Sequence, residues 1–439
     1  MEKIINSKYL FCFGTRPEAI KMAPVIHELK KQKIIFKVCV TAQHREMLDQ
    51  VLDFFEITPD YDLDLMKAGQ TLNGLSSSIF SGIDEVFDDW LGLRQAQSDR
   101  DGLRRFDKLH FDRLSGAEGN GLRQAQSGLR QAQSGLRQAQ SGLRQAQSDK
   151  QGLRRAQSDM VLVHGDTTTA SMIAQAAFHR QIKVGHVEAG LRTYNKTSPF
   201  PEEINRQLIS RIADVHFTPT ERANTNLLKE GIPAEQIILT GNTVVDALHW
   251  AAERLSGKEL AQEIIELKTL LNNEKKLILV TGHRRENFGE GLEEIGEALL
   301  ELSSYPDVEI IYPVHLNPNV KHPVQKMLGN KPDIHLVSPV AYPTMLWLMQ
   351  RAEVIISDSG GIQEEAPAFG KPVLVTREFS ERMEGVEAGF SVLVGTNRSK
   401  IVEQTTRLLN NPPDLKKKPN PYGDGKAAER IVGFLKDLY

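Results

Sequence analysis

The chain has 439 residues, of which 40% are hydrophobic and 25% are charged, and it carries a formal net charge of -3 at pH 7. This length accommodates two or three domains with buried cores, and the composition is that of an ordinary soluble protein. The charge balance excludes a strongly basic nucleic-acid-binding protein, and the longest apolar runs fall far short of the roughly 18 residues that a membrane helix needs. We therefore expect neither nucleic acid nor a membrane among its partners.

The N-terminal residues and the cysteines bear on the cellular compartment. Only a brief apolar patch precedes Gly14, which is not the pattern of a secretory signal. The two cysteines, Cys12 and Cys39, lie in apolar runs that are typical of strands, as expected of buried thiols in a reducing compartment. We expect a cytoplasmic protein.

Basic side chains stand at the first predicted strand-to-helix turn. An apolar strand at Lys8–Phe13 leads through Gly14 into a helix that should end near Gln32. The free amides at the start of this helix point at any anion above the strand. Arg16 adds a planar fork of donors and Lys21 adds an ammonium group, and both suit phosphate. The alternative is that both are solvated surface charges.

Residues 91–158 interrupt the alternation of strands and helices. The heptad Gly-Leu-Arg-Gln-Ala-Gln-Ser occurs four times in perfect tandem from Gly121 to Ser148. Each copy contains a glycine, which costs about 1 kcal/mol in a helix interior, and only one large apolar residue. We therefore predict a flexible, exposed insertion rather than a coiled coil, with solvated linker as its simplest role.

The charge and place of this insertion suggest that it leaves the chemistry intact. Residues 92–158 contain 13 Lys or Arg and 6 Asp or Glu, so the rest of the chain is acidic. The insertion lies between a helix expected at Ile79–Trp90 and a strand expected at Met160–Val163. Helix-to-strand connections of a doubly wound sheet lie on the side opposite the ligand crevice.

Acidic residues follow predicted strands in the stretch from Val161 to Arg206. Asp166 comes after one apolar run, Glu188 after the next, and Glu202 shortly afterwards. Ligands bind beyond the carboxyl ends of parallel strands, and we expect these carboxylates together on that side. Such a group is costly unless a cation or proton chemistry holds it there. The alternative is that Asp166 merely caps the following helix.

A second alternating series begins at Lys276, and its polar motifs also follow strands. The turn Ser359-Gly360-Gly361 precedes a helix, so its backbone amides suit a phosphate group. Glu365, about one turn further, suits a ribose diol. His283 ends the first strand of the series and is a phosphate ligand, a proton donor or a structural residue.

The two series predict an α/β fold with two Rossmann-like domains facing across a cleft. We expect an N-terminal domain at 1–243, which contains the insertion, a nucleotide-binding domain at 244–420, and a C-terminal helix at 421–439 that packs back on the first domain. The sequence has no Walker A motif, no dinucleotide glycine motif after a strand and no His/Cys metal spacing, so ATP hydrolysis, nicotinamide chemistry and zinc lack support.

Nine short motifs carry a family resemblance. They are GTRPEAIK from Gly14, TAQHRE from Thr41, VHGDTT from Val163, GHVEAGLR from Gly185, PEEINR from Pro201, GNT from Gly241, TGHRRE from Thr281, PVHLNP from Pro313 and DSGGIQEE from Asp358. In order and content they resemble the bacterial non-hydrolysing UDP-N-acetylglucosamine 2-epimerases. The resemblance implies a GT-B fold, a homodimer, and interconversion of UDP-GlcNAc and UDP-ManNAc without a cofactor, supplying ManNAc for surface polysaccharides.

The resemblance also implies roles for particular residues. The family removes the proton at carbon 2 of the sugar while UDP leaves carbon 1, and then adds UDP back to the resulting glycal. The implied catalytic residues are Asp166, Glu188, Glu202 and His283. The implied substrate-binding residues are Arg16, Lys21, Ser359, Gly360, Gly361, Glu365 and Arg382. A second UDP-GlcNAc, acting as an allosteric activator, would lie near Gln43, Glu46 and His315, and no metal is implied.

Two other functions remain open at this point. One is a GT-B glycosyltransferase that uses a UDP-sugar, since that fold supports both activities. The other is an inactive interaction protein whose repeat segment recruits a partner. The residues alone also leave open which carboxylate acts as the base.

Overall fold

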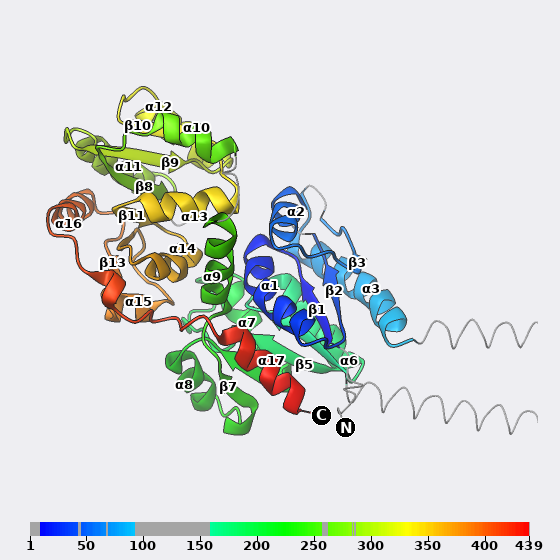
Figure 1. Cartoon of the computed structure of the whole chain (residues 1–439). Coiled ribbons are helices and arrows are strands. Elements are labelled where there is room, and N and C mark those ends of the chain that lie inside the picture. Colours follow the sequence, from blue (N-terminus) through cyan, green and yellow to red (C-terminus); the bar gives the residue numbers. More distant parts are fainter. Residues whose placement is uncertain are drawn as a thin grey trace, which may run out of the picture.

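A computed structural model describes residues 9–42, 45–66, 69–92, 159–256, 262–282, 284 and 287–438 of the chain. These residues form two sheets in which every paired strand is parallel (Figure 1). Of the predicted insertion at 91–158, only residues 91 and 92 are among them. No helix in this part of the chain offers an apolar stretch long enough to cross a bilayer.

The first sheet has seven strands in the order β3-β2-β1-β4-β5-β6-β7. They are β1 (Tyr9–Phe13), β2 (Phe36–Val40), β3 (Tyr61–Asp62), β4 (Met160–His164), β5 (Lys183–Val187), β6 (Val215–Thr218) and β7 (Ile237–Leu239). Alternate side chains of β1 enter different cores, with Phe11 and Phe13 on one face and Leu10 and Cys12 on the other. Both faces are therefore covered, which explains the nearly continuous apolar runs in the sequence.

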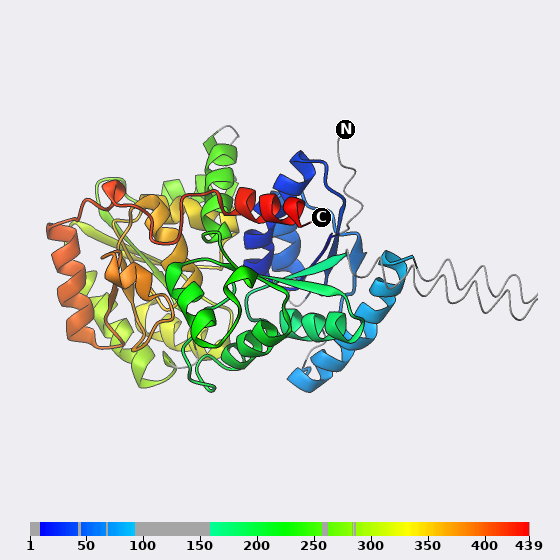
Figure 2. The same cartoon turned by 90° about the horizontal axis from the view of Figure 1, so that it is seen from below.

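Two layers of helices cover this sheet, as Figure 2 shows. One layer consists of α1 (Arg16–Lys31), α2 (Arg45–Phe54) and the C-terminal α17 (Ala427–Asp437). The other consists of α3 (Leu72–Trp90), α6 (Thr168–His179) and α7 (Glu202–Ile212), while α8 (Glu221–Lys229) lies against β7. The hydroxyl of Tyr9 donates to the carbonyl of Leu435 at 2.7 Å and so joins the last helix to the first strand.

The second sheet has six strands in the order β10-β9-β8-β11-β12-β13. They are β8 (Lys276–Thr281), β9 (Val308–Pro313), β10 (Ile334–Val337), β11 (Val354–Ser357), β12 (Val373–Val375) and β13 (Ser391–Leu393). One face packs on α11 (Glu290–Leu302), α12 (Pro318–Leu328) and α16 (Arg398–Asn410). The other packs on α10 (Gln262–Leu270), α13 (Tyr342–Arg351) and α14 (Gly360–Glu365), and α15 (Met383–Glu387) precedes β13.

The predicted fold class is confirmed, and one predicted helix boundary is wrong. Two facing parallel α/β units form the GT-B arrangement. The helix expected at Ile79–Trp90 begins at Leu72, because the side chain of Thr71 accepts a hydrogen bond from the amide of Gly74 at 3.1 Å and caps the first turn. The division into domains at residue 243 stays a prediction.

Helix α9 (Thr243–Ser256) lies between the two units and packs on α1, α14 and α17 (Figure 1). Its Trp250 ring lies 4.8 Å from the ring of Phe55, which follows α2. The ring of Phe55 is also 6.2 Å from that of Tyr342, the first residue of α13. One continuous apolar core therefore runs from the first sheet through α9 to the second.

Replacing Phe55 by alanine should lower the free energy of unfolding by about 3–5 kcal/mol, because its fully buried ring contacts both units through this core. Chemical denaturation measures the change. Phe178, which is 61% exposed, provides the control, and its replacement by alanine should change the value by less than about 0.5 kcal/mol. Equal losses for the two variants would contradict the role given to this core.

Replacing residues 93–158 by a flexible Gly/Ser linker should leave turnover and the thermal midpoint close to those of the full chain. The segment connects the end of α3 to the start of β4, whereas the loop at the far end of β4 carries Asp166. Steady-state kinetics and calorimetry of the shortened chain test this. A large loss of either quantity would show that the insertion supports the fold.

Candidate active site

The two sheets have corresponding points at which the strand order reverses. In the first sheet the chain leaves β1 toward α1 on one face and β4 toward α6 on the other. In the second sheet the chain leaves β8 toward α11 on one face and β11 toward α14 on the other. Ligands of doubly wound sheets bind in the crevice that such a divergence opens. Most of the predicted site residues lie at these two points.

Glu18 joins the two loops of the first point. Its carboxylate accepts hydrogen bonds from the amides of Gly14 at 3.0 Å and Thr15 at 2.8 Å, and from the hydroxyl of Thr167 at 2.8 Å. A side chain at Gly14 would meet the hydroxyl of Thr41 at 2.1 Å, so only glycine fits this turn. Burial raises the pKa of Glu18 to about 7, although these hydrogen bonds oppose the shift.

Asp166 does not cap the following helix, so that interpretation is wrong. The cap of α6 is Thr167, whose hydroxyl accepts a hydrogen bond from the amide of Ala170 at 3.0 Å. The carboxylate of Asp166 instead forms an ion pair with Arg206 of α7. The side chain of Asn205 donates to the carbonyl of Asp166 at 2.8 Å, which fixes the loop against α7.

Arg206 is a candidate site residue that the sequence analysis missed. Its side chain is only 2% exposed, and its Nε and Nη1 have no hydrogen-bond partner among the described residues. Its Nη1 lies 3.9 Å from the carboxylate of Glu203, beyond hydrogen-bond distance. A buried guanidinium with donors that form no hydrogen bond suits an anionic or carbonyl group of a ligand. The available signal was its spacing, because Arg206 lies four residues after Glu202 and so on the same face of α7.

Glu188 follows β5 in a conformation that is unusual for a residue with a side chain. Its φ is 62°, in the left-handed region, where a non-glycine residue is held at a cost that functional sites often carry. Its carboxylate forms an ion pair with Lys21, and the Nε2 of His164 lies 3.8 Å from it. Lys21 is therefore buried and paired, so the alternative of a solvated surface charge is wrong for this residue.

Glu202 is the first residue of α7 and carries a proton more readily than an ordinary glutamate. Burial raises its pKa, and the negative charge of Asp166 adds to the shift, while Arg284 and Arg206 oppose it. Its Oε2 is buried and has no hydrogen-bond partner among the residues described. The negative charges of Glu188 and Asp166 in turn help to raise the pKa of Arg382 in the second unit. The predicted carboxylates thus gather around arginine and lysine side chains.

The glycine turn of the second unit is shaped around Arg382. A side chain at Gly360 would approach the guanidinium carbon of Arg382 to 2.8 Å, so glycine lets the arginine lie against the turn. The Nε of Arg382 donates to Glu364 at 2.9 Å, and a second ion pair joins it to Glu381. Ser359 and Gly361 flank Gly360 at the start of α14.

Arg16 and Glu365 face each other from different units. Burial raises the pKa of Glu365 to about 7, and the positive charge of Arg16 opposes the shift. The neighbouring carboxylate of Glu364 adds to it, and the hydroxyl of Tyr342 is a hydrogen-bond partner. Arg16 comes from the start of α1, whereas Glu365 ends α14.

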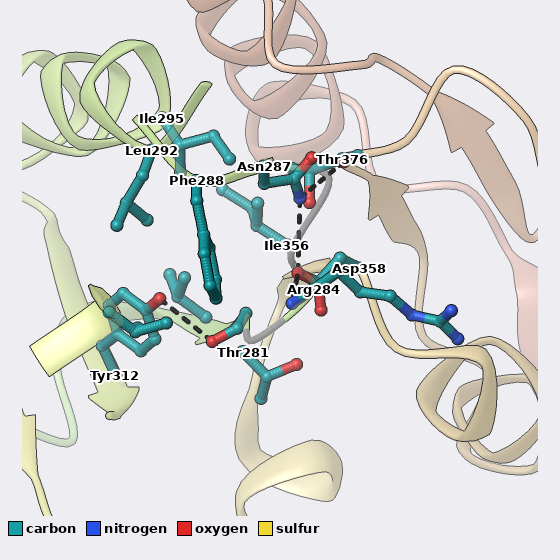
Figure 3. A pocket seen from close by; sticks show the side chains of 13 residues that line it. Thr281, Arg284, Asn287, Phe288, Leu292, Ile295, Tyr312, Ile356, Asp358 and Thr376 are labelled. Carbon is teal, nitrogen blue, oxygen red and sulfur yellow. Dashed lines mark hydrogen bonds between the residues drawn. The ribbon is translucent and has the colours of Figure 1, made fainter. Parts of the chain in front are cut away.

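A small pocket lies beneath the loops that follow β8 and β11 (Figure 3). Its apolar part includes Phe288, Leu292 and Ile295. At its rim, Asp358 accepts hydrogen bonds from the amide of Arg284 at 2.9 Å and from the side chain of Asn287 at 3.3 Å. Figure 3 shows the guanidinium of Arg284 pointing away from the apolar residues. Asp358 thus fixes the loop that carries Arg284 beside Glu202.

The remaining predicted residues are not brought into this group. His283 and Gln43 lie outside the described residues. Glu46 is exposed in the first turn of α2, and His315 is exposed after β9, where its Nδ1 accepts a hydrogen bond from the amide of Asn317 at 3.1 Å. In the part of the chain that the structure describes, no group of three or more His, Cys, Asp or Glu side chains is arranged to hold a metal ion.

Comparison with known proteins points to one family. A family profile described as UDP-N-acetylglucosamine 2-epimerase matches residues 111–436. The UDP-N-acetylglucosamine 2-epimerase of Escherichia coli K12 is 43% identical over 436 residues, which cover 98% of each chain. That of Campylobacter jejuni is 42% identical over 441 residues, which cover 98% of this chain and 97% of the relative.

Two solved structures share the whole architecture. The UDP-GlcNAc 2-epimerase of Neisseria meningitidis, bound to UDP-GlcNAc, superposes with a TM-score of 0.79 at 42% identity, and the match covers 98% of this chain and 100% of that one. The enzyme of Methanocaldococcus jannaschii, in complex with UDP-GlcNAc and UDP, superposes with a TM-score of 0.73 at 28% identity, covering 98% of this chain and 99% of that one.

Proposed function

The chain belongs to the UDP-N-acetylglucosamine 2-epimerase family, and we propose that it interconverts UDP-GlcNAc and UDP-ManNAc by inverting carbon 2 of the sugar. The observation that carries this proposal is the arrangement of charges between the two units. Asp166, Glu188 and Glu202 belong to the first unit. From the second unit, the charge of Arg382 acts on Asp166 and Glu188, and that of Arg284 acts on Glu202. Proton-transfer groups and cations thus converge where a nucleotide sugar would lie.

The proposed reaction is an elimination followed by an addition. A carboxylate removes the proton from carbon 2 while the bond from carbon 1 to the diphosphate oxygen breaks, which leaves a glycal and UDP. UDP then adds back to carbon 1, and a proton is delivered to carbon 2 on the opposite face. Both directions need a base and an acid, and Asp166, Glu188 and Glu202 are the proposed set. The raised pKa of Glu202 suits it to hold a proton.

The departing diphosphate needs positive charge that is in place before the bond breaks. Arg382, Lys21 and Arg206 are buried and already held by carboxylates, so little reorganisation is required. We propose that these cations and the turn Ser359-Gly360-Gly361 bind the diphosphate, with Arg16 and Glu365 at the nucleoside. The role given to His283 stays a prediction from the family motif.

The assembly and compartment are further parts of the proposal. We propose a homodimer in the cytoplasm, as the family likeness implies, and UDP-GlcNAc as a second, activating ligand near Glu46 and His315. A glycosyltransferase of the same fold is the competing enzyme class, and the repeat segment leaves an inactive interaction protein as the competing non-enzyme.

Incubation with UDP-GlcNAc in deuterated water distinguishes these functions. The epimerase should form UDP-ManNAc and incorporate deuterium at carbon 2 without any acceptor, because the abstracted proton exchanges with solvent. Proton NMR and mass spectrometry follow both changes. A product that appears only with an acceptor sugar would indicate a glycosyltransferase, and a folded protein that gives neither signal would indicate an interaction protein.

Glu202→Gln should lower kcat by about 10²–10⁴-fold, since an amide cannot transfer the proton, while the affinity for UDP stays close to that of the wild type. Initial rates and calorimetric titration with UDP measure the two quantities. Glu221→Gln makes the same chemical change at an exposed position of α8 and serves as the control. Unchanged turnover in the Glu202 variant would remove this residue from the catalytic set.

A further inference from the structure

A row of alternating charges crosses from the second unit into the first. In order its members are Arg377, Glu381, Arg382, Glu364, Lys21 and Glu188. All of them are buried. The Nη1 of Arg377 lies 3.1 Å from Glu381, and the Nε of Arg382 lies 2.9 Å from Glu364. The step between the units is the ion pair of Glu364 with Lys21, at 2.6 Å.

Glu364 is the most deeply buried member of this row, with 1% of its surface exposed. Its Oε1 accepts the hydrogen bond from Arg382, and its Oε2 faces the ammonium group of Lys21. Both oxygens therefore lie beside protein cations, although the contact of Oε2 with Lys21 is an ion pair without hydrogen-bond geometry. A carboxylate so deeply buried is retained only with such partners, and its loss would leave two buried cations short of a counter-charge.

We propose that Glu364 is a positioning residue for epimerisation. It acts by holding Lys21 of the first unit and Arg382 of the second in place beside the sugar. This rests on the proposed function. Lys21 comes from α1 and Arg382 precedes α15, so no element of one unit fixes both. Among the described residues the α14 carboxylate forms an ion pair with both side chains, and so it holds them close to each other.

The charge state of Lys21 provides a readout that a purely structural role would not change. Burial disfavours the ammonium form, but Glu188 and Glu364 outweigh it and raise the pKa of Lys21. The other charged or titratable groups that face it are Arg382, Glu365 and His164. Removing the charge of Glu364 leaves Glu188 as the one carboxylate of the two that still raises this pKa, and Arg382 then opposes the ammonium form with less compensation.

Glu364→Gln tests the proposal, because glutamine keeps the shape and the acceptor for Arg382 but removes the charge that faces Lys21. We expect kcat to fall by about 100-fold, as a displaced catalytic group causes, with a smaller change in KM. We also expect the alkaline limb of the pH–kcat profile to move to lower pH by about one unit or more, since Lys21 loses its proton more easily.

Glu381→Gln is the matched control. It makes the same change on the other side of Arg382, beside Arg377 and away from Lys21. It should raise KM through Arg382 and leave the alkaline limb in place. Glu364→Asp keeps the negative charge and should keep the alkaline limb near its wild-type position. We expect kcat to fall, because the shorter aspartate side chain leaves a longer distance to Lys21 and Arg382. This variant decides the question if Glu364→Gln does not fold.

A folded Glu364→Gln variant with the wild-type pH profile would overturn the proposal, as would a Glu364→Asp profile displaced as far as that of glutamine. An equal displacement in Glu381→Gln would also overturn it, because the effect would then belong to Arg382 alone. Absence of turnover in the wild type would instead contradict the proposed function.

Discussion

The site depends on the ion pairs that the buried ammonium group of Lys21 forms with two carboxylates. The ammonium group lies between Glu188 of the first unit and Glu364 of the second. An unpaired lysine at such depth would cost several kcal/mol, and the two carboxylates offset this cost. The α1 helix that carries it starts at a turn where only glycine fits at position 14 and where Glu18 binds the backbone. Local backbone geometry thus places the charge that joins the two units.

The contacts between the units have two different physical characters. Around α9 they are apolar, and a single core includes Trp250, Phe55 and Tyr342. Between α1 and α14 they are ionic and directional, through Lys21 and Glu364. Apolar packing tolerates small rotations because it has no preferred direction, whereas an ion pair with hydrogen bonds is sensitive to them. The α9 core therefore keeps the units together, and the ion pair of Lys21 with Glu364 defines how they meet.

The sequence was informative about the sheets and about part of the site. Long strands buried on both faces appear as continuous apolar runs, and polar residues after them lie at one edge, which is how Asp166 and Glu188 were identified. The two-residue β3 and the partly exposed β10 and β13 were not predicted, since they are too short or too mixed in polarity. Glu364 was missed because its partner Lys21 is distant in sequence and leaves no local pattern. The partner of Arg206, Asp166, is distant as well, so its spacing from Glu202 was the one local signal for Arg206.

In this site, different side chains carry the permanent positive charge and transfer the protons. Burial, together with the adjacent Lys21, lowers the pKa of His164 to about 3, so this imidazole stays neutral beside Glu188. The positive charge is left to Lys21 and to arginines such as Arg382, whose pKa values their carboxylate partners raise in spite of burial. Such cations do not lose protons at neutral pH, and they provide constant stabilisation for a leaving diphosphate. Proton transfer is then left to carboxyl groups such as Glu202, whose pKa burial raises, so that it holds a proton more readily than an ordinary glutamate.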